Sequence, residues 1–402
     1  MHKSIQNKNI VLCVCGGIAA YKSVELLRLL VTHGAAVRVV MTKNAAEFVG
    51  PLTFEALSGS PVCITLFGEN TGFSIRHITW AEKADAVIVA PATANIIGKL
   101  ANGIADDAMS TFMMAVTSLK VLCPAMNTHM YENRAVQRNI DKLESDGFFI
   151  LEPDAGELAC GAVGPGRLPD PENIIDLLNS LLTPKDFSGR KVLVTAGPTR
   201  EPLDPVRFIS NPSSGKMGFA LAKAAEQRGA EVVLISGPVS LPDPSRITTI
   251  KVNTAMEMAD AVFSYMDQSD IIIKTAAVSD YRPVDPADHK IKKGAETITL
   301  SMQKTGDILK KLGENKKNRI LVGFAAETKN LEQYAQKKLC EKNLDLIVGN
   351  IVGSSSSSGF QSETNKVTLF FKDGTEKSLP LMKKEEVAHA ILQNILCFTS
   401  PA

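Results

Sequence analysis

The sequence lacks an excess of charge of either sign. Its 402 residues include 44 lysines and arginines against 43 aspartates and glutamates, which gives a formal net charge of +1. A protein that binds nucleic acid or an anionic membrane through its charge carries a clear basic excess. We therefore expect small molecules, and neither nucleic acid nor a membrane, as the partners of this chain.

Long apolar runs are missing as well. No stretch reaches the roughly 18 apolar residues that a membrane-spanning helix needs. The first residues lead directly into a candidate strand and lack the regions of a signal peptide. These features predict a cytoplasmic protein.

The seven cysteines show no paired spacing, no Cys-x-x-Cys and no metal-binding cluster. This pattern is typical of reduced thiols in a reducing compartment. Cys13 and Cys15 fall in an apolar run, where we expect small buried hydrophobes. Cys160 differs, because the glycine- and proline-rich stretch 159–167 has the composition of a loop, where a thiol can meet a ligand.

Apolar strands alternate with helices in both halves of the chain. The expected elements are, in chain order, 9–15, 19–33 and 37–41, and then 191–195, 219–228 and 231–235. Between them, a helix over 174–182 is followed by turn formers and charges, which is typical of a domain boundary. The sequence predicts an α/β protein of two Rossmann-like three-layer domains with mainly parallel sheets, 1–185 and 186–402.

Ligands of such folds bind where strands run into loops at their carboxyl ends. In the first half these ends are expected at 39–42, 86–91 and 121–124. Neither half contains a complete G-x-G-x-x-G, which weakens an NAD(P)-dependent oxidoreductase as an alternative. Gly16 and Gly17 still lead into a helix, and this turn either binds a phosphate through its N–H groups or simply makes a tight turn.

Three short segments of the first half carry chemically useful groups. His77 lies in 74–78, Asn127 in 124–127 and Cys160 in 159–167. A base that titrates near neutrality, an amide that can hold an anion and a weak acid are what a decarboxylation assisted by an electron sink requires. A lone histidine is more often structural, so only the combination is informative.

Together, and in this order, the three segments resemble the signature segments of the flavin-dependent cysteine decarboxylases. The resemblance implies that His77 is the catalytic base, that Asn127 binds the substrate carboxylate and that Cys160 donates a proton. It also implies FMN as the electron sink that the reaction needs. The residues implied to hold FMN are Gly16, Gly17, Ile18, Thr42, Thr93, Ala94, Asn95 and Ala125.

The second half contains a stretch, 209–218, that superficially resembles a phosphate-binding loop. It is not a Walker A sequence, because Met217 stands where Ser or Thr should follow the lysine. The stretch opens a helix, so its N–H groups could still hold a phosphate or an acyl phosphate ester.

Three more segments of the second half are 276–282, 289–293 and 323–328. By itself the basic run at 290–293 is typical of a solvated turn. Together the segments closely resemble the phosphopantothenate-cysteine ligases. The resemblance implies that Lys290 stabilises charge while an acyl cytidylate forms and that Asn211 holds this intermediate. The residues implied to surround CTP are Asp280, Lys290, Thr305, Gly306, Asp307, Ile308, Phe324, Lys338 and Lys342.

Over nearly its whole length the chain therefore resembles the bacterial fusion family of bifunctional coenzyme A biosynthesis enzymes. This implies that cysteine is joined to 4'-phosphopantothenate with CTP, and that 4'-phosphopantothenoylcysteine is then decarboxylated to 4'-phosphopantetheine. Mg2+ is expected to be held largely by the CTP phosphates. The resemblance also implies a homo-oligomer, built from flavoprotein trimers, often in dodecamers, and from ligase dimers. One departure is the serine-rich loop 351–358, which has the composition of a flexible linker.

A regulatory subunit that keeps the fold and binds a flavin or nucleotide without chemistry is an alternative from another class. The presence of His77, Asn127, Cys160 and Lys290 favours an enzyme. The bound cofactor, whether FMN, a nicotinamide or none, would distinguish the alternatives.

Overall fold

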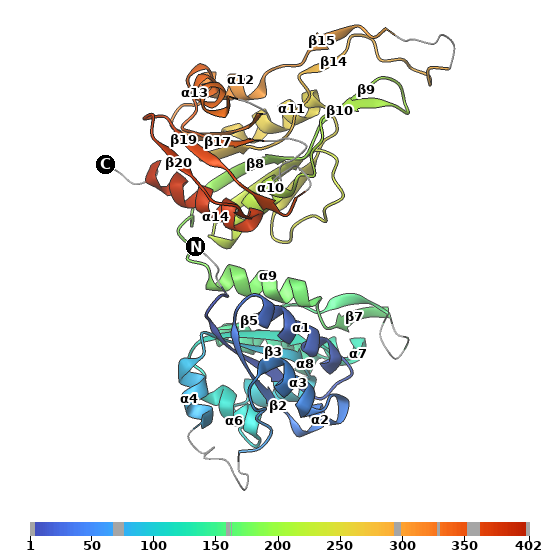
Figure 1. Ribbon diagram of the computed structural model, residues 1–402. Helices are drawn as coiled ribbons and strands as arrows, with labels where there is room; N and C mark the ends of the chain where they lie inside the picture. The colour runs from blue at the N-terminus through green and yellow to red at the C-terminus, as the bar shows by residue number, and fades with distance from the viewer. Residues whose placement is uncertain are drawn as a thin grey trace. The chain divides into compact units, whose positions relative to one another are not determined.

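The computed structural model describes residues 5–66, 76–157, 161, 163–292, 299–327, 330–351 and 362–398 of the chain. They form two compact units, an N-terminal unit that ends at Thr183 and a C-terminal unit that begins at Pro184. Each unit has a mainly parallel sheet covered by helices on both faces (Figure 1), which confirms the predicted α/β class. None of the described helices combines the length and the hydrophobicity that a bilayer span requires.

The N-terminal unit is built on a five-stranded parallel sheet with the order β2-β1-β3-β4-β5. Its strands, and those of a separate hairpin, are β1 (Asn9–Val14), β2 (Ala36–Met41), β3 (Ala86–Ala92), β4 (Leu119–Pro124), β5 (Phe148–Ile150), β6 (Asp154–Glu157) and β7 (Val163–Arg167). Its helices are α1 (Ala20–Thr32), α2 (Lys43–Phe48), α3 (Pro51–Ser58), α4 (Arg76–Lys83), α5 (Ala94–Ala101), α6 (Ala108–Met114), α7 (Thr128–Tyr131), α8 (Arg134–Ser145) and α9 (Pro171–Leu182).

The first strand shows why this sheet is apolar at almost every position. Successive side chains of a strand point to opposite faces. Leu12 of β1 packs in the core beneath α1 and α9, whereas Cys13 packs in the core beneath α5, α6 and α8. Cys15 is also buried, and burial raises the pKa of its thiol to about 12. Cys13 and Cys15 are therefore structural, as the apolar run predicts.

The prediction of a loop over 159–167 is wrong for its second part. Residues 163–167 form β7, which pairs antiparallel with β6. Glycines at 164 and 166 hide this strand from a propensity argument, because glycine is depleted in strands unless another backbone approaches closely.

The C-terminal unit has an eight-stranded sheet with the order β12-β11-β8-β13-β16-β17-β19-β20, in which β19 and β20 pair antiparallel. The sheet strands are β8 (Lys191–Ala196), β11 (Glu231–Ser236), β12 (Thr248–Lys251), β13 (Ile271–Lys274), β16 (Ile320–Glu327), β17 (Leu346–Ile351), β19 (Thr368–Phe371) and β20 (Glu376–Ser378). Small hairpins are made by β9 (Arg200–Pro202) with β10 (Phe208–Ser210), β14 (Tyr281–Pro283) with β15 (Met302–Lys304), and β18 (Thr364–Asn365) with β21 (Met382–Lys383).

Helices cover this sheet on both faces (Figure 1). One core joins the sheet to α10 (Lys216–Gln227) and α14 (Lys384–Ile395). The other joins it to α11 (Ala255–Met266), α12 (Ile308–Glu314) and α13 (Leu331–Glu341). A short 3-10 turn, Leu396–Phe398, follows α14.

A buried arginine ties the start of the C-terminal unit to two of its helices. Arg228, at the end of α10, is only 2% exposed and donates two hydrogen bonds of 2.7 and 2.6 Å to the carboxylate of Asp186. It also donates to the carbonyl of His389 and the side chain of Gln393 on α14. Its guanidinium lies over the ring of Phe187.

We predict that Arg228→Ala destabilises the C-terminal unit by about 3 kcal/mol, because it removes a buried charge whose partners are left unsatisfied. Lys337→Ala, which removes an exposed 3.8 Å pair with Glu341, is expected to cost less than about 1 kcal/mol. Hydrogen exchange of peptides from α10 and α14 during a urea titration would report this unit separately. Equal protection in the two variants would contradict the prediction.

Candidate active sites

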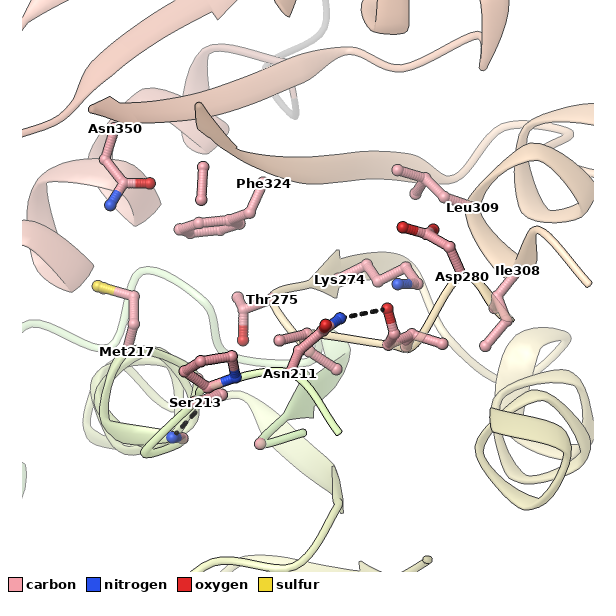
Figure 2. Close-up of a pocket in the computed structure, with 18 of the residues that line it drawn as sticks. Asn211, Ser213, Met217, Lys274, Thr275, Asp280, Ile308, Leu309, Phe324 and Asn350 are labelled. Atoms are coloured by element: carbon pink, nitrogen blue, oxygen red, sulfur yellow. Dashed lines mark hydrogen bonds between the residues drawn. The ribbon is translucent and has the colours of Figure 1, made fainter. Parts of the chain in front are cut away.

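A cavity of about 760 Å³ lies at the carboxyl ends of the parallel strands of the C-terminal unit. Figure 2 shows the side chains that converge on it from β13, β16, β17 and the starts of α10 and α12. This edge of the sheet is where α/β folds bind their ligands.

The structure brings together nearly all the residues that were expected around CTP. Those that line the cavity are Asp280, Thr305, Gly306, Asp307, Ile308, Phe324, Lys338 and Lys342, and Asn211, which was expected to hold the acyl cytidylate, lines it as well. They come from separate loops, strand ends and helix ends of the unit. Lys290 is not among the lining residues.

Hydrogen bonds fix the floor of this cavity. Asn211 donates from Nδ2 to the carbonyl of Val278 at 3.0 Å (Figure 2). Thr305 donates from Oγ1 to the carbonyl of Ser279 at 2.6 Å. Two segments that are distant in sequence are thereby held against the segment that follows β13.

The start of α10 is pressed against the same strand ends. A Cβ at Gly218 would lie 2.5 Å from the Cβ of Ala196 and 2.5 Å from Oγ1 of Thr275, so only glycine fits without a shift. Gly215 precedes the helix with a φ of 75°. The helix therefore begins at Lys216, three residues before the expected start, and its first turn faces the cavity.

The charges that line the cavity are mostly positive. The charged lining residues in the described part of the chain are Lys216, Lys274, Lys304, Lys338, Lys342 and Lys384, with Asp280 and Asp307. Some of the lysines have acidic partners: Lys342 pairs with Asp307 at 2.9 Å and Lys338 with Glu327 at 2.8 Å. Lysines in excess over carboxylates suit a ligand with several negative charges.

Asp307 also caps α12 by accepting a hydrogen bond from the N–H of Lys310 at 3.0 Å. Burial opposes ionisation of this carboxyl, but the N–H of Lys310 and the ammonium of Lys342 outweigh it and lower its pKa. The carboxylate is therefore charged at neutral pH and holds Lys342 at the edge of the cavity.

Sequence reasoning missed Lys274, which ends β13 and lines the cavity. Burial lowers the pKa of its ammonium to about 8, and the nearby charge of Lys342 acts in the same direction. The available signal was a lysine that follows three isoleucines at the end of a strand.

Lys290 is exposed, and the segment that carries it is anchored elsewhere. The side chain of Asp204 is fully buried and accepts a 3.1 Å hydrogen bond from the N–H of Ile291. Arg207 pairs with Asp204 at 3.0 Å and donates to the carbonyl of Ile291. Both backbone groups of the residue after Lys290 are therefore held.

Burial opposes ionisation of Asp204 as well. The N–H groups of Val206, Ile291 and Arg207 outweigh burial and lower its pKa. Its charge therefore persists well below neutrality, and the anchor of the Lys290 segment persists with it.

In the N-terminal unit, the residues expected to hold FMN follow the ends of four adjacent strands. Gly16, Gly17 and Ile18 follow β1, Thr42 follows β2, Thr93, Ala94 and Asn95 follow β3, and Ala125 follows β4. Because the strands are parallel and adjacent, these loops meet at one edge of the sheet.

The glycine turn is held tightly against this edge. A Cβ at Gly16 would lie 2.5 Å from the Cβ of Asn44. Thr42 caps α2 by accepting a 3.2 Å hydrogen bond from the N–H of Ala45. Ala19 precedes α1 and supplies no side-chain cap, but the N–H of Ala20 donates to the carbonyl of Gly17 at 2.9 Å and the N–H of Lys22 to that of Ala19 at 3.0 Å.

The loop after β4 is packed against β7. The N–H of Met126 donates to the carbonyl of Gly166 at 3.0 Å. A Cβ at Gly166 would lie 2.2 Å from the carbonyl oxygen of Met126, and one at Gly164 2.7 Å from Thr128. The segments 124–127 and 159–167, which were expected to carry catalytic groups, are thereby brought together. Asn127 also caps α7, because its side chain accepts a 2.9 Å hydrogen bond from the N–H of His129.

Two other residues, His77 and Cys160, were expected to act with Asn127. His77 belongs to α4, but its side chain lies outside the described residues, and so does Cys160. The serine-rich loop is described only at Ile351, and the rest of it also lies outside the described residues.

Two family models match the chain. The flavoprotein family matches residues 1–183, and the DNA/pantothenate metabolism flavoprotein C-terminal domain matches residues 187–398. The coenzyme A biosynthesis bifunctional protein CoaBC of Bacillus subtilis (strain 168) is 54% identical over 395 residues, 97% of each chain. The protein of the same name from Escherichia coli (strain K12) is 47% identical over 398 residues, 98% of each chain. A crystal structure of the C-terminal domain of a CoaBC protein is 46% identical, with a TM-score of 0.45, and the match covers 52% of this chain and 96% of that one.

The chain belongs to the family of bifunctional coenzyme A biosynthesis enzymes. It joins a ligase to an FMN-dependent decarboxylase, and these catalyse two consecutive steps of that pathway. The resemblance seen in the sequence is thereby confirmed.

We predict that Asp204→Asn lowers the turnover of the ligase reaction by about tenfold or more, because the Lys290 segment loses its charged anchor. The decarboxylation of added 4'-phosphopantothenoylcysteine should be unchanged, since Asp204 lies in the C-terminal unit and the residues expected to catalyse decarboxylation lie in the N-terminal unit. Asp243→Asn, which breaks an exposed pair with Lys251, is the matched control. Turnover within twofold of the wild type would contradict this anchoring role.

We predict that Gly166→Ala lowers decarboxylase activity by about tenfold or more, because β7 must move away from the loop that carries Asn127. Gly50→Ala is the control, since its added methyl group meets nothing within 4 Å and its φ is −61°. Both variants would be assayed for decarboxylation and for ligation. A decarboxylase defect shared equally by the two variants would argue against a specific role of the β7 contact.

Proposed function

We propose that the C-terminal unit, residues 186–402, carries the ligase reaction at the 760 Å³ cavity, and that the N-terminal unit, residues 1–185, carries the decarboxylase reaction at the carboxyl edge of its sheet. The observation that carries the proposal is the convergence on one cavity of the residues expected around CTP. The excess of lysines over carboxylates there supports a nucleoside triphosphate as the ligand.

In the ligase reaction, the carboxylate of 4'-phosphopantothenate is a poor acyl donor. Transfer of a cytidylyl group from CTP creates a good leaving group, with pyrophosphate as the other product, and the amine of cysteine then displaces CMP. Asn211 holds the acyl cytidylate, and the hydrogen bond from its side chain to the carbonyl of Val278 fixes the position of Asn211. The family resemblance assigns the stabilisation of the charge that develops during the first transfer to Lys290, although this residue is exposed and does not line the cavity in this structure.

Mg2+ belongs to this proposal as a companion of the nucleotide. The described residues contain no group of three or more His, Cys, Asp or Glu side chains arranged to hold a metal ion. Asp280 and Asp307 line the cavity and carry the carboxylate oxygens that a hard cation prefers. The triphosphate would then supply most of the ligands.

In the decarboxylase reaction, the donor groups at the N-terminal site fit FMN. The glycine turn at 16–17 and the hydroxyl of Thr42 suit its phosphate, and Thr93 and Asn95 offer hydroxyl and amide groups to the flavin. When bound, FMN supplies the electron sink that makes loss of carbon dioxide possible. Asn127 binds the substrate carboxylate, His77 serves as the base, and Cys160 returns the proton that completes 4'-phosphopantetheine.

A homo-oligomer is the remaining part of the proposal. The family resemblance is its basis, with trimers and dodecamers expected for the flavoprotein half and dimers for the ligase half. Light scattering of the purified enzyme measures it directly.

The test is an assay with 4'-phosphopantothenate, cysteine, Mg2+ and either CTP or ATP, followed by mass spectrometry. We predict that CTP supports formation of 4'-phosphopantetheine, that Cys160→Ala accumulates 4'-phosphopantothenoylcysteine, and that Lys290→Gln stops before it. Added 4'-phosphopantothenoylcysteine should restore product formation in Lys290→Gln but not in Cys160→Ala. Loss of both activities in either variant would contradict the division of the two reactions between the units.

A further inference from the structure

We propose that Lys274 is a further nucleotide-binding residue of the ligase cavity, whose ammonium pairs with the anionic phosphates of the bound nucleotide. The inference rests on the proposed function, because it takes this cavity as the nucleotide site. It adds a residue to those expected from the sequence.

The sheet determines where Lys274 lies. The strand β13 is central, between β8 and β16, and Lys274 is paired in register with Thr195 and Gly323. The alternation of side chains puts Lys274 on the same face as Ile272, the face covered by α11, α12 and α13. At that edge the lysine lines the cavity, and Figure 2 shows it beside Asp280.

The charged groups that face its ammonium are Lys342, Asp307 and Asp280. Asp307 is already engaged, since it pairs with Lys342 and caps α12. Within the described part of the chain, the ammonium of Lys274 makes no hydrogen bond and no ion pair within 4 Å. It therefore differs from Lys338 and Lys342, which both have carboxylate partners.

A lysine in this position destabilises the free enzyme unless a ligand supplies a partner for its ammonium. A partly buried ammonium without a close partner costs free energy, and an apolar side chain would fill the end of the strand without that cost. A phosphate group would neutralise Lys274 and balance the adjacent charge of Lys342. A group of this kind, perturbed and facing a cavity, is a candidate for ligand binding.

The proposal has a consequence for pH. Because the pKa of Lys274 is lowered to about 8 in the free enzyme, part of the population is neutral at slightly alkaline pH. An anionic ligand favours the charged form, so nucleotide binding takes up protons. Affinity should fall as the pH rises above about 8, with a slope that approaches about tenfold per pH unit.

The experiment is calorimetric titration of the full-length enzyme with CTP and Mg2+, without 4'-phosphopantothenate, between pH 7 and 9.5. Two buffers of different ionisation enthalpy would count the protons taken up. We expect Lys274→Met to weaken CTP binding by about tenfold or more at pH 7 and to abolish its part of the proton uptake. Lys274→Arg should keep the affinity and lose the decline above pH 8, because arginine stays charged.

Lys310→Met is the matched control, because Lys310 is an exposed lysine of α12 that does not line the cavity. Hydrogen exchange of peptides from α10 and α14 verifies that the C-terminal unit of each variant is folded. Should Lys274→Met fail to fold, the pH profile of Lys274→Arg decides, because a decline identical to that of the wild type would overturn the inference.

A dissociation constant of Lys274→Met within twofold of the wild type would also overturn it. Failure of the wild type to bind CTP is a different result. It would overturn the proposed nucleotide site, and this inference with it, whereas an unaffected Lys274→Met variant overturns the inference alone.

Discussion

The parallel, in-register pairing of β8 with β11 and β13 is the constraint on which the ligase cavity depends. Ser236 pairs with Ala196, and Lys274 pairs with Thr195, so three strands end at the same edge of the sheet. A parallel sheet covered on both faces leaves this edge as the place where polar loops can meet a ligand. Lysines, Asn211 and the start of α10 converge there because the strands end together.

Close backbone approach at glycine holds the functional loops of both units to their sheets. In the C-terminal unit, Gly218 brings α10 against β8 and the residue after β13. In the N-terminal unit, Gly166 brings β7 against the loop that carries Asn127. In each case a side chain would occupy the space of a neighbouring atom, so the loop position depends on the absence of a Cβ.

Electrostatics divides the lysines of the C-terminal unit into two kinds. Lys338 and Lys342 are each paired with a carboxylate in the free enzyme. Lys274 is placed by the sheet in a partly desolvated position without such a partner, and its charge depends on what occupies the cavity. The lysines of the first kind are held in position before a ligand binds, whereas the protonation of Lys274 changes when a ligand binds.

Much of the fold was predictable because strands and helices carry local patterns. The runs at 9–15 and 191–195 are short and almost wholly apolar, which is typical of buried strands, and both contain a strand. The stretch 174–182 repeats its apolar residues with the period of a helix, and it lies within α9. The segments around Asn127 and Asn211 were also recognisable, since their residues are neighbours in the chain. Local patterns could not reveal β7, whose glycines are favourable only because Met126 and Thr128 lie against them.

The sequence by itself determined the α/β class, the two-unit organisation of its patterns and the segments that carry chemistry. Tertiary structure alone decided that Lys274 joins the cavity, that Lys290 does not line it, and that Asp204 anchors the segment beside Lys290. The physical reason is that burial, ion pairing and close packing depend on residues brought together from distant parts of the chain. No local pattern records which distant group will face a given side chain.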